Sequence, residues 1–330
     1  MTRFTGPAST PVGASQRDLA AWKDRFRRPD GVPHPKTNPA TPEKVVLGKT
    51  LFFDPRLSRS SSVSCATCHN PSLGWSDGLS RAVGFGMVPL SRRTPQVRNL
   101  AWGTAFQWDG RADSLEAQAR MPITAPDEMN MSMDLIVERL KALPGYKQLF
   151  RDAFGGEESI GARNVTAALA TFQRTIVSGE APFDRWIKGE EEAIGPDARR
   201  GFALFTGKAN CAACHSGWRF TDDSFHDIGL RADDDLGRGK FVPPSVTAMR
   251  YAFKTPSLRD LRMQGPYMHD GQLSSLDAVI EHYVKGGERR PSLSFEMKPV
   301  ELSVQERRYL TAFLESLAAE PSSLTLPQLP

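Results

Sequence analysis

The chain has only four cysteines in 330 residues, and this small number limits what they can do. A disulfide framework is typical of short secreted chains, whereas a chain of this length can bury enough core to fold without one. A structural zinc site would need two Cys pairs roughly 15–20 residues apart. Here the second pair begins 146 positions after the first (211 − 65), so neither reading explains the cysteines.

Long apolar runs and a strong charge of either sign are also absent. No stretch of 18 apolar residues occurs, so we expect no membrane span. The formal net charge is only +4, which is too small to favour nucleic acid as a partner. Residues 1–15 are rich in Pro, Thr, Ser and Gly and lack the apolar core of a signal peptide.

Both Cys pairs are followed directly by a histidine, in the motifs C-A-T-C-H (65–69) and C-A-A-C-H (211–215). In C-x-x-C-H the two thiols attach one haem covalently and the histidine ligates its iron. A thioredoxin-like redox motif does not require that histidine. The sequence therefore predicts two covalently bound c-type haems, attached by Cys65, Cys68, Cys211 and Cys214, with His69 and His215 as axial ligands.

An internal repeat divides the chain into two related halves. R-T-P-Q-V-R-N-L (93–100) parallels K-T-P-S-L-R-D-L (254–261), an offset of 161 positions (254 − 93). Asp-Gly at 109–110 and Leu-Glu at 115–116 have counterparts at the same offset. We therefore expect an N-terminal leader (1–41), an N-terminal haem domain (42–190) and a C-terminal haem domain (191–330), related by duplication.

The expected fold is mainly α-helical, with little strand. Helices are predicted for 43–53, 164–178, 198–205 and 304–319 from their apolar periodicity and capping residues. Thr41 and Pro42 form a favourable helix start, and Ser303 with Glu306 forms a capping box. The Gly/Pro-rich stretches 70–95 and 221–257 are expected to be long loops that wrap the haems.

Further motifs around the two haem motifs resemble those of the bacterial di-haem cytochrome c peroxidase/MauG family. They are W-D-G-R-A (108–112) with S-L-E (114–116), P-x-E-M (126–129) and G-P-Y-M-H-D-G (265–271). The resemblance covers roughly residues 42–319. It implies two cytochrome c-like domains, with peroxide chemistry at the N-terminal haem and electron relay at the C-terminal haem.

Two positions favour the MauG-like branch of that family. Peroxidases of the family carry a distal His about sixteen residues after the first haem His, where this chain has Phe85. The resemblance thus implies that the N-terminal iron is open to peroxide. At the second haem, Tyr283 stands where peroxidases carry an axial Met and MauG carries Tyr; the alternative is a packed Tyr283, with His282 or Met268 as the ligand.

The resemblance also implies an acid–base residue and an accompanying glutamine. Glu116 matches the distal glutamate by its position after Leu115, although Asp113-x-x-Glu116 also reads as a helix-capping pair. The family's glutamine would fall on Phe106, and Gln107 lies one residue later. We therefore expect Glu116, assisted by Gln107, to manage the protons of peroxide.

Three further features concern electron transfer and calcium. Trp102 and Trp108 are the candidates for coupling the two haems, with core packing as the alternative for both. The family holds calcium with an Asn where this chain has Arg93, so calcium is in doubt. MauG carries a Trp six residues before its second haem His, whereas this chain has Ala209; Trp218 is a candidate substitute.

The resemblance implies an enzyme that uses hydrogen peroxide to form a high-valent iron state. That state would oxidise an aromatic residue, expected to be tryptophan, on a partner protein. One alternative is a cytochrome c peroxidase that takes electrons from a small cytochrome or copper protein, and another is a non-enzymatic electron carrier. A periplasmic location is expected, because bacterial c-type haem attachment resembles a periplasmic process.

Overall fold

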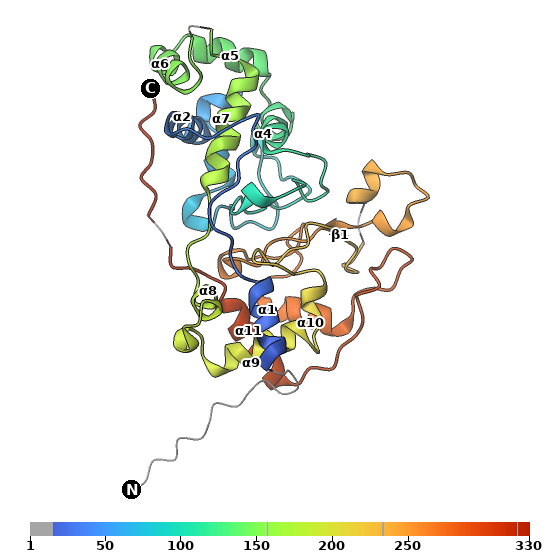
Figure 1. The fold of residues 1–330 in the computed structure, drawn as a ribbon. Coiled ribbons are helices and arrows are strands. Elements are labelled where there is room, and N and C mark those ends of the chain that lie inside the picture. Colours follow the sequence, from blue (N-terminus) through green and yellow to red (C-terminus); the bar gives the residue numbers. More distant parts are fainter. Residues whose placement is uncertain (1–15, 157, 233, 322) are drawn as a thin grey trace.

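The computed structural model of the chain describes residues 16–156, 158–232, 234–321 and 323–330. Its ribbon forms two mostly helical lobes, one above the other in Figure 1, with long loops between them. The Pro/Thr/Ser/Gly-rich residues 1–15 lie outside the described part of the chain. Within that part, no helix has the length and apolar character needed to cross a bilayer.

The upper lobe of Figure 1 is built around α2 and α7, which run side by side. Thr41 caps α2, because its side chain accepts a hydrogen bond from the Lys44 amide, and Pro42 occupies the first turn as predicted. The helices of this lobe are α2 (Pro42–Phe53), the short α3 (Cys65–Cys68), α4 (Leu115–Thr124), α5 (Met133–Lys141), α6 (Pro144–Phe154) and α7 (Ala162–Thr175).

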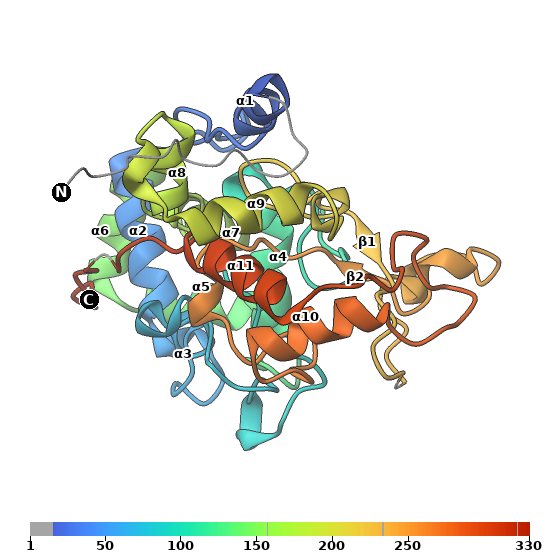
Figure 2. The same ribbon diagram turned by 90° about the horizontal axis from the view of Figure 1, so that it is seen from below.

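The lower lobe is built around the packed pair α9 and α11, which lie next to each other in Figure 2. The predicted capping box is present, with Ser303 accepting from the Glu306 amide and Glu306 accepting from the Ser303 amide. The helix ends at Glu315, four residues earlier than predicted, with Ser316 as its C-cap. The helices of this lobe include α8 (Pro182–Ile187), α9 (Pro196–Thr206), α10 (Leu276–Lys285) and α11 (Val304–Glu315).

A glycine brings the main helix pair of each lobe into close contact. A Cβ at Gly48 of α2 would lie 2.0 Å from the Ala168 carbonyl oxygen of α7. A Cβ at Gly201 of α9 would lie 1.9 Å from the Tyr309 carbonyl oxygen of α11. Both glycines begin a G-x-x-L-F sequence, so the same contact is built twice from the same local sequence.

The segment predicted as a leader takes part in the lower lobe. After α1 (Gln16–Arg25), Phe26 is fully buried and stacks on Phe220 at 4.9 Å between ring centroids. Phe183 of α8, on the N-terminal side of the predicted boundary, belongs to the same core. The aromatic neighbours of Phe26 all belong to the lower lobe. The exact division of the chain into domains remains a prediction.

The duplication is visible in local structure at the predicted offset of 161. The ten-residue helices α4 and α10 begin at Leu115 and Leu276 (276 − 115), and both have a serine N-cap. Isolated bridges join Phe106 to Ala112 in one half and Tyr267 to Leu273 in the other. The repeated residues therefore form the same turn-then-helix unit in each half.

Strands are scarce, as predicted. Among the described residues the sheet structure consists of β1 (Phe225–His226) and β2 (Phe253–Lys254), an antiparallel pair. The loops predicted at 70–95 and 221–257 are mostly irregular with short 3₁₀ turns, and both contribute residues to the wall of the central cavity.

Candidate active site

One cavity of about 620 Å³ is lined by residues of both haem motifs. The lining includes every predicted haem-attachment residue: Cys65, Cys68, His69, Cys211, Cys214 and His215. In the first motif the two thiols lie three residues apart on the single turn of α3, so they share one side of that turn. The cavity thus presents two pairs of thiols, each beside an imidazole.

Both imidazoles are oriented by a backbone carbonyl. Nδ1 of His69 donates to the Trp75 carbonyl at 3.3 Å, and Nδ1 of His215 donates to the Phe220 carbonyl at 2.9 Å. Burial lowers the pKa of both histidines, which favours the neutral ring that a metal requires. With Nδ1 engaged in this way, Nε2 is the nitrogen that would ligate a metal, as in other histidine sites fixed by a second hydrogen bond. The thiol pairs and oriented rings therefore fit two c-type haems.

Tyr283 lies on α10 and lines the cavity beside the second motif. Burial raises the pKa of its phenol above the usual range, and the nearby thiols of Cys211 and Cys214 add to the effect. Its neighbour His282 points Nε2 to the Ile228 carbonyl at 2.8 Å, so that nitrogen is already engaged. Met268 also lines the cavity. The position of Tyr283 is compatible with its expected role as an axial ligand.

The counterpart of Tyr283 in the first half is Pro122. The two residues are 161 positions apart (283 − 122), occupy the same place in α10 and α4, and both line the cavity. A proline side chain has no atom that can bind iron. In the loop after the first haem motif, Gly84 lines the cavity but Phe85 does not. Of Pro122 and Phe85, Pro122 is therefore the residue that faces the cavity.

Glu116 does not lie where the sequence suggested. It is not among the residues that line the cavity, and its carboxylate accepts from both terminal nitrogens of Arg174 at 2.8 and 2.9 Å and from Asn38 at 2.8 Å. Burial alone would raise the pKa of Glu116, but these hydrogen bonds outweigh burial and lower it. The reason is geometric, because α4 turns Gln118 and Pro122 toward the cavity and Glu116 toward α7.

Glu128, next to Asp127, is a carboxyl residue that does line the cavity. Burial raises the pKa of Glu128, and the charge of Asp127 raises it further. Gln118 and Pro122 line the same cavity from α4. In the sequence, Glu128 is recognisable only as part of the motif P-x-E-M. The signal for a role was that this motif glutamate has no helix to cap.

The remaining predicted residues divide between the cavity and the core. Gln107 and Trp108 both line the cavity, and Trp108 donates from Nε1 to the Arg93 carbonyl at 3.0 Å. Trp102 instead packs edge-on against Trp218 at 4.7 Å between centroids, and neither of these two lines the cavity. Of the two candidates for coupling the haems, the geometry therefore favours Trp108.

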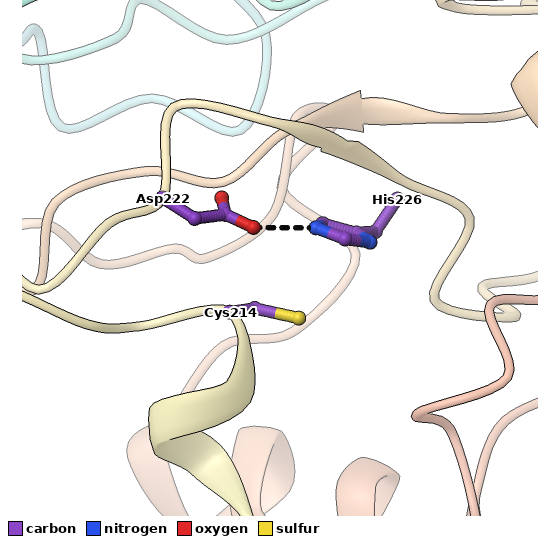
Figure 3. A group of neighbouring side chains, drawn as sticks. All are labelled: Cys214, Asp222 and His226. Atoms are coloured by element: carbon purple, nitrogen blue, oxygen red, sulfur yellow. Dashed lines mark hydrogen bonds and ion pairs between the residues drawn. The ribbon is translucent and has the colours of Figure 1, made fainter.

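A histidine–aspartate pair lies beside the second haem motif (Figure 3). His226 Nε2 is 2.8 Å from Asp222 Oδ2, and the Cys214 thiol lies within 4.8 Å of both groups. The hydrogen bond with Asp222 and a second one with the Cys214 thiol raise the pKa of His226 to about 10. Because Cys214 is a haem-attachment residue, the three side chains form part of the haem surroundings rather than a separate metal centre.

Comparison with known proteins agrees with this geometry. Residues 42–192 match the family described as "Di-haem cytochrome c peroxidase", and residues 198–318 match "Cytochrome c". A solved "MauG-like protein associated with microbial copper homeostasis" superposes with a TM-score of 0.83 at 28% identity, covering 89% of this chain and 95% of the other.

Two curated relatives align over nearly the whole chain. "Methylamine utilization protein MauG" of Methylorubrum extorquens is 81% identical over 100% of this chain and 94% of its own length. The protein of the same name from Methylophilus methylotrophus is 54% identical over 93% of this chain and 92% of its own length. The chain belongs to the bacterial di-haem cytochrome c peroxidase/MauG family and is a peroxide-dependent haem oxidoreductase with two covalently bound c-type haems.

Proposed function

We propose that the protein uses hydrogen peroxide to oxidise an aromatic residue, expected to be tryptophan, on a partner protein in the periplasm. The 81% identity to a relative named for methylamine utilization supports a partner in the same process. We favour this role over the alternative in the family, a cytochrome c peroxidase that removes peroxide with electrons from a small cytochrome.

The observation that carries the proposal is the asymmetry between Pro122 and Tyr283. Pro122 stands on the first haem's side of the cavity without a donor atom, which leaves room for peroxide. Tyr283 offers a phenol at the equivalent place on the second side. A hard oxygen donor favours oxidised iron, whereas the Met of peroxidases favours reduced iron. One half is thus suited to react with peroxide and the other to retain oxidising power.

Glu128 is the group best placed to move the protons. When bound, the haems supply the electrons that reduce peroxide to water. Glu128 takes the proton from one peroxide oxygen and returns it to the other, which leaves as water. Because its pKa is raised toward neutral pH, the Glu128 carboxyl group can both accept and donate a proton. Gln118 can donate a hydrogen bond to the bound peroxide and hold it in place.

Trp108 is the proposed connection between the two halves. Its ring lies in the cavity wall and is 6.5 Å from the His269 ring, which belongs to the second half. The bond from its Nε1 to the Arg93 carbonyl fixes its orientation. An aromatic ring held between the two haem pockets provides a short route for electrons.

The experiment is peptide mass spectrometry of the partner. The holoenzyme is mixed with stoichiometric peroxide and with a candidate protein substrate from methylamine utilization, without any reducing cytochrome. Peroxide-dependent oxidation of a specific tryptophan of the partner supports the proposal. An unchanged partner, together with rapid turnover when reduced cytochrome is supplied, would favour the cytochrome c peroxidase activity instead.

A further inference from the structure

Arg93 is a buried residue at the junction of the two halves and is one of the residues that line the cavity. It is only 5% exposed. Its amide donates to the His269 carbonyl at 2.8 Å, and its own carbonyl accepts from Trp108 at 3.0 Å. These backbone bonds hold Arg93 between a loop of the second half and the tryptophan proposed to couple the haems.

The guanidinium of Arg93 has little to neutralise it. Nη2 donates to the Ser76 hydroxyl at 3.3 Å, and the buried Nε has no partner among the residues that the structure describes. Burial lowers the pKa of Arg93, against the opposing influence of Asp77 and Tyr267. A buried cation without a counter-ion is costly, so the site calls for an anion.

Several other arginines that line the cavity already have carboxylate partners. Arg92 bonds both Asp109 and Asp235, with contacts of 2.5 and 2.6 Å. Arg219 pairs with Asp223, and Arg290 pairs with Asp227. In the described part of the chain no such pair is formed by Arg93, so a counter-ion for it would come from what the cavity holds.

We propose that the Arg93 guanidinium binds a propionate carboxylate of a bound haem and so supplies the positive charge at the junction of the two halves. Each haem carries two propionates, and a planar guanidinium can bind a carboxylate through two parallel hydrogen bonds. The unpartnered Nε together with a terminal nitrogen is one such pair of donors. This inference rests on the two haems and is independent of the proposed partner protein.

The same charge bears on calcium. Arg93 occupies the position at which the family's calcium site has an asparagine. A fixed guanidinium repels a divalent cation that approaches within a few ångströms, and the repulsion is stronger in a buried site. A positive charge is therefore already present, and the protein does not need calcium to provide it.

The test is redox titration of the holoenzyme, followed by visible absorbance, in Arg93→Gln and Arg93→Lys. Removing a positive charge close to a haem favours the oxidised state, so Arg93→Gln should lower the midpoint potential of at least one haem. Arg93→Lys keeps the charge and should fall between Arg93→Gln and the native protein. The matched control is Lys240→Gln, because Lys240 also lines the cavity but already pairs with Asp235 at 2.9 Å; its potentials should stay native.

Each outcome decides the inference. A midpoint potential that is lowest in Arg93→Gln, intermediate in Arg93→Lys and native in Lys240→Gln would support it, as would failure of Arg93→Gln alone to accumulate with both haems. Native potentials in Arg93→Gln would overturn it. Equal behaviour of Arg93→Gln and Arg93→Lys would also overturn it, because the shape of the side chain rather than its charge would then matter.

Discussion

Pro122 and Tyr283 occupy the same position in two copies of one helix. α4 and α10 are equal in length, start from equivalent serine N-caps and direct these two residues to the same cavity. The duplicated scaffold thus presents a residue without a donor atom to one haem and a phenol to the other. Under the proposed function, this difference would let two similar halves carry out different chemistry.

Pro122→Tyr should remove the difference. A tyrosine at this register places a phenol toward the first haem as Tyr283 does toward the second, so the reaction with peroxide should slow by about tenfold or more. Stopped-flow absorbance after mixing with peroxide measures the rate. Pro122→Val is the control, since it adds no donor atom and should keep the site open; a fast Pro122→Tyr would contradict the assignment.

Tyr283→Met should change the second haem in the opposite sense. A thioether favours reduced iron, so the midpoint potential of that haem should rise. Oxidation of the partner protein should fall, while turnover with reduced cytochrome should increase. Potentiometry and the two activity assays together check this. An unchanged potential would show that Tyr283 is not the ligand and would favour Met268 as the ligand instead.

Glu128→Gln should impair the reaction with peroxide. The amide cannot shuttle a proton, and general acid–base catalysis contributes roughly 10²–10⁴-fold, so the rate should fall by about that factor. Glu116→Gln is the matched control. It should react with peroxide at the native rate but unfold more easily by about 1–3 kcal/mol, because Arg174 loses its carboxylate. The reverse pattern would restore Glu116 as the proton carrier.

The pH dependence should report Glu128. Its carboxylate must be ionised to take a proton from peroxide, so the rate should fall as pH drops through its pKa. Because burial raises that pKa, the fall should occur at higher pH than for an ordinary glutamate. Glu128→Gln should lose this limb of the profile. A limb below the usual glutamate range would instead fit Glu116, whose pKa is lowered.

Chelation should leave the native protein unchanged. If Arg93 supplies the charge between the halves, prolonged dialysis against a strong calcium chelator should alter neither the midpoint potentials nor the peroxide rate. Both are measured before and after dialysis, with added calcium as the reciprocal control. A loss restored by calcium would show that a cation site persists beside Arg93.

The sequence was sufficient for features that depend on local spacing. The haem motifs, the caps at Thr41 and Ser303, and the offset of 161 all predict structure because a repeated local sequence forms the same turn and helix. The relation between Pro122 and Tyr283 was contained in that offset. It became recognisable once α4 and α10 were seen to line one cavity.

Features that depend on which side of an element faces the cavity were harder to predict. Glu116 and Gln118 are two positions apart on α4, about 200° around the helix, and capping logic could not tell which side faces inward. Glu128 lies in the turn after that helix, where apolar periodicity does not predict which side chains face the cavity. Phe26 lies outside both repeats, so nothing in the duplication indicated that it completes the second core.

The most direct test of the account is EPR of the fully ferric protein before and after stoichiometric peroxide, without a reductant. We predict one high-spin signal from the open first haem and one low-spin signal from the second, both lost when peroxide is added. Two low-spin signals that do not respond to peroxide would contradict the account, because they would mean that the side occupied by Pro122 is closed.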